Sequence, residues 1–331
     1  MSVSAPEQCS AKNALKIRDE ESGIRNFNIN IPHPSFLIPL CFLIIFFLFN
    51  SCERRNNKHD SLLIAVSIPP QAWFVSQIAG DKADTLILVP PGQNPHSYEP
   101  TPRQIQSLAG ADAWLLSGSE FEISLRPKIE SLFPNLLIID GTQGAELRLL
   151  EYHAHDDHDD RDHDHNDTTP YIDRHIWLGR EPAKILAEHI KNTLCLLDNE
   201  NEIYYVNRYT HLLLEINEVF YKLKNDLAPL EGKSVFVYHP SFGYFFDEFG
   251  IIQEAVEMGG KEPTPRQLNN LMEKINQEKP AAIFVQAQFP VNAAKTLADA
   301  SGARVIELDP LAENWLENIK YMGQTLKNVI Q

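Results

Sequence analysis

NENEIYYVNRYTHLLLEINEVFYKLKNDL, residues 199–227, is the stretch of sequence that decides the fold. Its apolar residues recur at spacings of three, four and seven, which predicts one face of a long amphipathic helix: Ile203, Val206, Leu213, Ile216, Phe220, Leu223 and Leu227. Pro229 and Gly232 follow and end the helix. At 1.5 Å per residue its length is about 40 Å. We therefore expect a stiff connection between two blocks of chain.

Short apolar runs alternate with helical patterns on both sides of this helix. They predict strands at LLIAV from 62, TLILV from 85, AWLL from 113 and LLII from 136, and later at SVFVY from 234, AAIFV from 281 and RVIEL from 304. Such alternation is typical of parallel sheets covered by helices. The predicted fold is α/β, with two lobes that each hold a mainly parallel sheet, one long rigid helix joining them, and a cleft between them.

The N-terminal region has the pattern of an export signal. The run from Phe36 to Phe49 is nearly all apolar, and it is shorter than the roughly 20 residues that a membrane-spanning helix needs. It suits the apolar part of a signal peptide. Cys52 follows directly after Asn50 and Ser51, as in a bacterial lipobox, where the cysteine receives lipid. An uncleaved membrane anchor with an incidental cysteine is the alternative.

These patterns divide the chain into four parts. Residues 1–52 are the export segment, 53–198 the N-terminal lobe, 199–229 the linking helix and 230–331 the C-terminal lobe. The location that follows is extracytoplasmic, as a periplasmic or cell-surface lipoprotein held to the membrane by its lipid.

The charge and the cysteines exclude several classes of partner and site. The formal net charge of −16 argues against nucleic acid or an anionic membrane surface as the main partner. The four cysteines are Cys9, Cys41, Cys52 and Cys195, and none forms a CxxC pair. A thiolate zinc site is therefore not expected.

Four polar residues follow or neighbour predicted strands, where open α/β sheets bind ligands. His96 lies in the loop PPGQNPHSYEP, His239 directly follows SVFVY, and Asp309 directly follows RVIEL. His175 lies in DRHIWL, before a predicted helix. Each has another interpretation when taken alone. His96 could be an exposed loop histidine and His239 a histidine at the edge of the core. Asp309 could be a turn residue, and His175 could cap a helix.

Three imidazoles and one carboxylate suit Zn²⁺, which takes four protein ligands in closed sites. A catalytic zinc site keeps one position for water, so a filled set of ligands favours holding the metal over using it. Asp173 and Glu99 are candidates for orienting the imidazoles. The sequence thus predicts a metal site in the interlobe cleft.

From about residue 62 to 331 the chain resembles the zinc/manganese substrate-binding proteins of ABC importers, which include metal-binding lipoproteins once called adhesins. The matching segments are VPPGQNPHSYEPTPRQ at 89–104, DRHIWL at 173–178, VYHPSFGYFFDEFGI at 237–251, EPTPRQL at 262–268 and LDPLAENW at 308–315. The resemblance implies a two-lobed fold, the ligands His96, His175, His239 and Asp309, and a monomer that delivers metal to a membrane permease without catalysis.

The residue at the third ligand position helps to predict which metal is bound. Manganese-type members of the family tend to carry a carboxylate where this chain has His239. Manganese prefers oxygen ligands, so three histidines favour zinc, with Mn²⁺ or Fe²⁺ as alternatives in the same role. The chain departs from the family pattern at two places. Residues 177–180 are WLGR where the family often has WLDP, and residue 286 is Gln where the family commonly has Glu.

A histidine- and aspartate-rich insert, residues 152–167, separates His96 from His175. Its histidines are His153, His155, His158, His163 and His165. Such a tract cannot bury apolar surface, so we expect a disordered loop that binds zinc weakly and feeds the deep site. A low-complexity acidic insert without a role is the alternative.

Two other classes of function compete with transport. A zinc hydrolase would need an open metal position and a general base, and no HExxH motif is present. A surface adhesin would need an exposed apolar patch, which one sequence cannot show.

Overall fold

The computed structural model describes residues 61–150, 171–257, 264–289 and 292–330. All of them belong to one compact unit, Lys58–Gln331. The predicted export segment with Cys52 and the histidine-rich insert lie outside the described residues.

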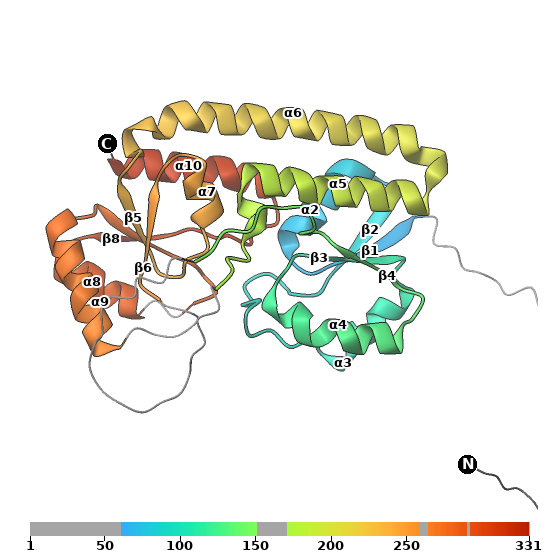
Figure 1. Ribbon diagram of the computed structural model, residues 1–331, viewed down its shortest axis with the longest axis horizontal. Helices are drawn as coiled ribbons and strands as arrows, with labels where there is room; N and C mark the ends of the chain where they lie inside the picture. The colour runs from blue at the N-terminus through green and yellow to red at the C-terminus, as the bar shows by residue number, and fades with distance from the viewer. Residues whose placement is uncertain (1–60, 151–170, 258–263, 290–291, 331) are drawn as a thin grey trace, which may run out of the picture. The chain divides into compact units, whose positions relative to one another are not determined.

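Two four-stranded sheets, parallel in every pairing, carry the fold (Figure 1). The first holds β1 (Leu62–Val66), β2 (Ala83–Ile87), β3 (Ala113–Leu116) and β4 (Leu137–Asp140) in the order β2-β1-β3-β4. The second holds β5 (Ser234–Val237), β6 (Ile252–Ala255), β7 (Ala282–Val285) and β8 (Arg304–Glu307) in the order β6-β5-β7-β8. The predicted α/β fold with two parallel sheets is confirmed, and both lobes have the same strand order.

Apart from shifts of one residue at strand ends, the predicted strands differ from the observed ones at β2 and β6. β2 begins at Ala83, two residues before the predicted start. The sequence also gave no sign of β6, which reads IQEA and lies at an edge of its sheet. Its Ile252 is exposed while Glu254 is buried, so the strand lacks the apolar run that marks the others.

The long helix is α6, Glu202–Leu227, flanked by single 3₁₀ turns at Asn199–Asn201 and Ala228–Leu230. The predicted apolar face is right at Ile216, Phe220, Leu223 and Leu227, which are buried. It is wrong at the start of the helix, where Ile203 is 78% and Val206 39% exposed.

Tyr205 takes the buried position at this end of α6. It lies about 200° around the helix from Ile203, because each residue turns the helix by about 100°. The ring packs inside while its hydroxyl donates to Asp198 Oδ2 at 2.6 Å. Tyr205 is therefore part of the core at this end of the helix, whereas the aliphatic side chains of Ile203 and Val206 face outward.

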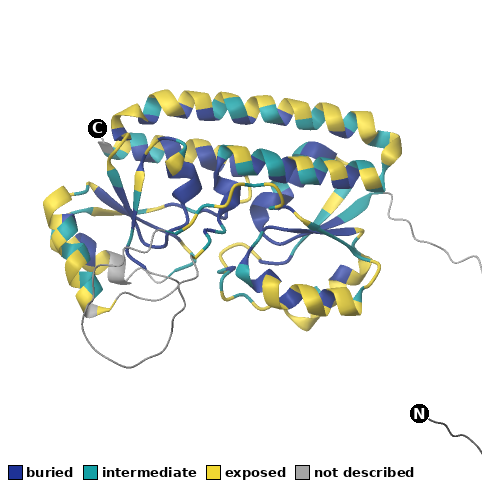
Figure 2. Cartoon of the chain, in the orientation of Figure 1, coloured by how far each residue is buried: buried dark blue, intermediate teal, exposed yellow. Residues whose placement is uncertain are grey.

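Helices enclose both sheets (Figures 1 and 2). Four of them form one layer that contacts both lobes, namely α2 (Pro69–Ala79), α5 (Arg180–Leu197), α6 and α10 (Trp315–Ile330). The remaining helices are α3 (Pro102–Ser107) and α4 (Glu120–Leu132) on the first lobe and α7 (Gly243–Asp247), α8 (Pro265–Glu278) and α9 (Asn292–Ser301) on the second. In the described part of the chain no helix is long and apolar enough to span a membrane.

One apolar core runs through both lobes beneath the four-helix layer. The Trp315 ring of α10 packs against Phe74 of α2 at 4.8 Å and Phe220 of α6 at 6.4 Å between centroids. Hydrogen bonds reinforce the junction, because Trp177 Nε1 donates to Pro310 O at 2.8 Å and Trp315 Nε1 donates to Trp177 O at 2.6 Å. Separating the lobes would expose this core to water.

The contact between α6 and α10 predicts an effect on stability. A Cβ at Gly323 of α10 would lie 2.3 Å from Leu223 Cδ2, whereas a Cβ at Gly110 would meet nothing within 4 Å. We expect Gly323→Ala to lower the free energy of unfolding by about 1–3 kcal/mol through overpacking. Gly110→Ala should change it by less than about 0.5 kcal/mol. Urea denaturation of the metal-free protein measures both, and equal effects would contradict the close packing of the two helices.

Candidate metal centre

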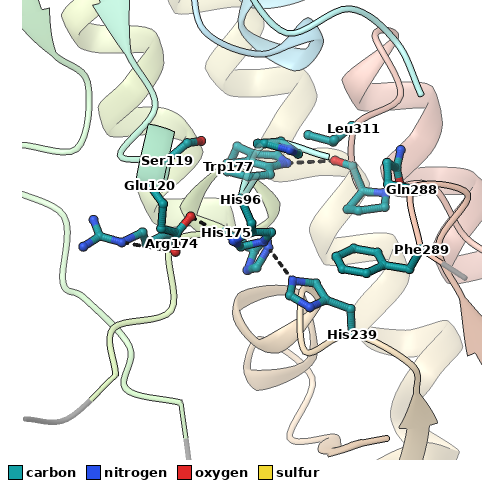
Figure 3. Close-up of a pocket in the computed structure, with 12 residues that line it drawn as sticks. His96, Ser119, Glu120, Arg174, His175, Trp177, His239, Gln288, Phe289 and Leu311 are labelled. Carbon is teal, nitrogen blue, oxygen red and sulfur yellow. Dashed lines mark hydrogen bonds and ion pairs between the residues drawn. The ribbon is translucent and has the colours of Figure 1, made fainter. Parts of the chain in front are cut away.

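Three histidine side chains from distant parts of the chain meet between the lobes (Figure 3). His96 lies in the loop after β2, His175 precedes the 3₁₀ turn Ile176–Leu178, and His239 follows β5. Their ring centroids are 4.7 to 5.3 Å apart. One nitrogen of each lies within 4.8 Å of the others, so the three could hold one metal ion.

Each imidazole has a carboxylate oxygen 2.8 Å from its Nδ1. The three pairs are His96 with Glu120, His175 with Asp173 and His239 with Glu257. A carboxylate that is ionised only accepts hydrogen bonds, so with ionised partners the hydrogen bonds at His175 and His239 place the proton on Nδ1 and leave a lone pair on Nε2. Such pairing fixes the tautomer and the ring orientation that metal-binding histidines need.

The spacing of the Nε2 atoms fits a tetrahedral metal. His175 Nε2 and His239 Nε2 are 3.3 Å apart. With both protons on Nδ1, these two nitrogens cannot hydrogen-bond to each other. Two Zn–N bonds of about 2.0–2.1 Å at a tetrahedral angle place their nitrogens about 3.3–3.4 Å apart. The pair is therefore arranged as two neighbouring ligands of one ion.

Burial and neighbouring charges shift the pKa values of the side chains at this centre. Burial, together with the charges of His175 and His96, lowers the pKa of His239 well below 6.5, so this imidazole is neutral at neutral pH. Burial alone would raise the pKa of Glu120, but the contact with His96 brings it below 4.5. Burial raises the pKa of Glu257 to about 7.

Two adjoining cavities meet at the three histidines. The smaller has a volume of about 20 Å³, and its lining includes Trp177 of the first lobe and Phe289 of the second. The larger has a volume of about 410 Å³ and is lined by residues of both lobes, including Tyr171 and Tyr238. The first has room for an ion, and the second adjoins it.

Local hydrogen bonds hold the ligand-bearing segments in place. The backbone N–H of His96 donates to Asn94 Oδ1 at 2.9 Å, and the backbone N–H of His175 donates to Asp173 Oδ1 at 3.0 Å. The ring of His239 stacks on Phe289, with centroids 4.3 Å apart and planes 18° from parallel. These contacts restrict the three imidazoles before any ligand arrives.

Asp309, the fourth predicted ligand, is not in the group of three. Its Oδ1 accepts from Gln288 Nε2 at 2.8 Å and from the backbone N–H of Leu311 at 2.9 Å. The next residues, Pro310 and Leu311, line the smaller cavity. Asp309 thus lies beside the centre, and its role as a ligand stays a prediction.

The carboxylates around the histidines differ in part from those expected. Asp173 contacts His175, whereas Glu99 is exposed and lines neither cavity. The carboxylate beside His96 is Glu120. Sequence reasoning missed both Glu120 and Glu257, although Glu120 begins the helix after β3, where strand-end reasoning could have found it. Glu257 follows β6, the strand that the sequence did not reveal.

Comparisons with known proteins identify the family of this chain. The family model for the periplasmic zinc-uptake complex component A, ZnuA, matches residues 64–329. The high-affinity zinc uptake system protein ZnuA of Bacillus subtilis is 26% identical over 282 residues, covering 83% of this chain and 87% of the relative. The manganese ABC transporter substrate-binding lipoprotein PsaA of Streptococcus pneumoniae is 25% identical over 305 residues, with coverage of 87% and 94%.

A solved structure of a ZnuA deletion mutant with zinc bound is 31% identical and superposes with a TM-score of 0.73, covering 82% of this chain and 98% of the other. The family model spans most of the chain and both lobes. The resemblance seen in the five sequence segments is therefore confirmed, and the chain belongs to the ZnuA family of periplasmic zinc-uptake components.

Proposed function

We propose that this protein is the extracytoplasmic solute-binding component of an ABC importer, which captures Zn²⁺ and delivers it to the membrane permease. The observation that carries the proposal is the set of three buried or half-buried imidazoles whose Nδ1 atoms all face carboxylates. One nitrogen of each ring lies within 4.8 Å of the others, so the three could bind a single ion. A transport role fits the absence of an open catalytic position once a fourth ligand closes the shell.

The donor set supports zinc over manganese. Three nitrogen ligands suit a borderline ion such as Zn²⁺, whereas Mn²⁺ prefers oxygen. The ZnuA relative belongs to a high-affinity zinc uptake system, and zinc is bound in the solved deletion mutant. The match to PsaA, a manganese lipoprotein, keeps Mn²⁺ as the alternative substrate in the same role.

Asp309 completes the proposed shell. Gln288 and the Leu311 N–H occupy Oδ1, and the proposal uses the other carboxylate oxygen, Oδ2, as the fourth ligand. Three neutral imidazoles and one carboxylate would then bind Zn²⁺ with a net charge of +1. Glu120, Asp173 and Glu257 contribute further negative charge around the ion.

The remaining features of the proposal concern location and partners. Lipid on Cys52 would hold the protein to the membrane beside its permease, and the protein would act as a monomer without enzymatic activity. His153, His155, His158, His163 and His165 would collect zinc for the deep site. Membership of the family supports the permease partner and the extracytoplasmic location.

Metal retention tests the proposed substrate. Residues 53–331 are stripped of metal and dialysed against equal Zn²⁺ and Mn²⁺, and bound metal is counted by mass spectrometry, with and without residues 153–165. We expect one tightly held zinc in both proteins, because the four deep ligands form the site. Retained manganese would overturn the substrate, and loss of zinc with the insert would overturn the ligand set.

The carboxylate beside His239 predicts opposite effects on affinity and stability. Glu257→Gln keeps the side chain's size but removes the charge that makes His239 a better ligand, so we expect zinc affinity to fall about 10–100-fold. Burial disfavours the ionised form of Glu257, whose pKa is raised to about 7. At pH 8 the neutral variant should therefore unfold no earlier than the wild type when both are metal-free.

The control for this variant is Glu130→Gln, which removes an exposed ion pair with Arg126 and should leave the affinity unchanged. Affinity is measured by competition with a chromophoric chelator, and stability by thermal unfolding. An unchanged affinity in Glu257→Gln would show that the carboxylate has no part in metal binding.

Acid should weaken zinc binding, because protons and zinc compete for the same imidazole nitrogens. The lowered pKa of His239 keeps this ligand neutral until the pH is well below 6.5. We therefore expect full affinity at neutral pH and a progressive loss as acidification protonates the imidazoles. Competition titrations at pH 7 and pH 5 measure the change, and equal affinities would exclude a site of three histidines.

A further inference from the structure

Gln286, the residue after β7, is fully buried and directs its carboxamide at the backbone of His239. Its Oε1 accepts from the His239 N–H at 3.1 Å, and its Nε2 donates to the His239 carbonyl at 2.8 Å. The same Nε2 donates to Ser241 Oγ at 3.0 Å. The backbone groups of His239 fix which end of the amide is oxygen, because one donates and the other accepts.

These contacts extend the second sheet past its last backbone pair. β5 and β7 pair up to Val237 with Phe284, and Tyr238 N–H then donates to Phe284 O at 2.7 Å. At His239 no strand backbone continues the ladder. The Gln286 side chain takes its place, since it offers one acceptor and one donor to a single residue as a neighbouring strand would. The backbone of His239 is thereby held as firmly as a strand residue.

The ring of His239 is fixed separately. Glu257 lies at its Nδ1, and Phe289 stacks on its face at 4.3 Å between centroids. Backbone and ring together determine where Nε2 points, and this atom lies 3.3 Å from His175 Nε2. A shift of the backbone by a few tenths of an ångström would move Nε2 relative to the other two ligands.

We infer that Gln286 is a positioning residue for metal binding: it offers no atom to the ion but sets the position of His239 through both of its backbone groups. The inference rests on the proposed function and deepens it. Gln288, two residues later, donates to Asp309. The short segment after β7 therefore contacts both of the proposed ligands in the second lobe.

The first lobe holds a matched residue away from the ligands. Gln71 is also fully buried, and its Oε1 accepts from the N–H groups of Ser67 and Ile68 at 2.8 and 3.2 Å. Its Nε2 donates to the carbonyl of Leu115 in β3 at 3.3 Å. Like Gln286, it ties together the carboxyl ends of the two central strands of its sheet, but it touches none of the proposed ligands.

The test replaces each glutamine by methionine, which keeps the volume and neutrality but removes the hydrogen bonds. Zinc affinity is measured by chelator competition, and the visible absorption of bound Co²⁺ reports the ligand geometry. We expect Gln286→Met to bind zinc about 10–100-fold more weakly and to alter the cobalt spectrum. Gln71→Met should lose stability to a similar extent while keeping the wild-type affinity and spectrum.

If Gln286→Met does not fold, Gln286→Asn takes its place, because it keeps the amide but withdraws it by one methylene. We expect an altered cobalt spectrum and weaker zinc binding in that variant too. Wild-type affinity and spectrum in the folded Gln286 variant, or an equal loss in Gln71→Met, would overturn the inference. Failure of the wild-type protein to retain zinc would instead overturn the proposed function.

Discussion

Two imidazole Nε2 atoms are held 3.3 Å apart in a buried site, and when the carboxylates at both Nδ1 atoms are ionised their lone pairs face and repel each other. The rest of the structure maintains this arrangement. In their ionised form the carboxylates on the far sides of the rings favour the proton on Nδ1, and this tautomer directs the Nε2 lone pairs inward. A cation removes the repulsion. The same contacts that make the metal-free site unfavourable therefore raise its affinity for a divalent ion, because little reorganisation is needed on binding.

This arrangement requires that the two lobes keep their positions, because His175 belongs to one and His239 to the other. α6 alone would not ensure it, since a helix fixed at its ends can still bend. The continuous core beneath α2, α5, α6 and α10 adds the necessary constraint. The hydrogen bonds among Trp177, Pro310 and Trp315 fix the alignment of the two lobes close to the smaller cavity. A wide opening of the lobes would disrupt both the core and these hydrogen bonds. Small movements around the site would therefore cost less free energy when an ion is loaded or released.

Local periodicity predicted most of this structure, and long-range contacts explain what it missed. The apolar runs marked every strand except β6, whose four residues, IQEA, include two polar side chains. The strand-end rule located His96 and His239, because the carboxyl ends of parallel strands lie at one edge of each sheet. His175 precedes a helical segment, so this rule did not locate it. The same rule could have located Glu120 after β3 but not Glu257, because β6 was not recognised. Which carboxylate reaches which imidazole depends on side-chain direction within each lobe, and this is not encoded in local spacing.

The two lobes share a topology but contribute differently to the candidate metal centre. Both sheets have the same strand order, and the hexapeptide EPTPRQ occurs at 99–104 and again at 262–267. In each copy the threonine begins a helix, α3 or α8, in a capping box with the glutamine three residues later. The loop that leads into the first copy carries His96, which faces the centre. In the second lobe Glu257 follows β6 and precedes the second copy in the sequence, and it contacts His239. The segment before the repeat thus carries a proposed ligand in the first lobe and a side chain that supports a proposed ligand in the second.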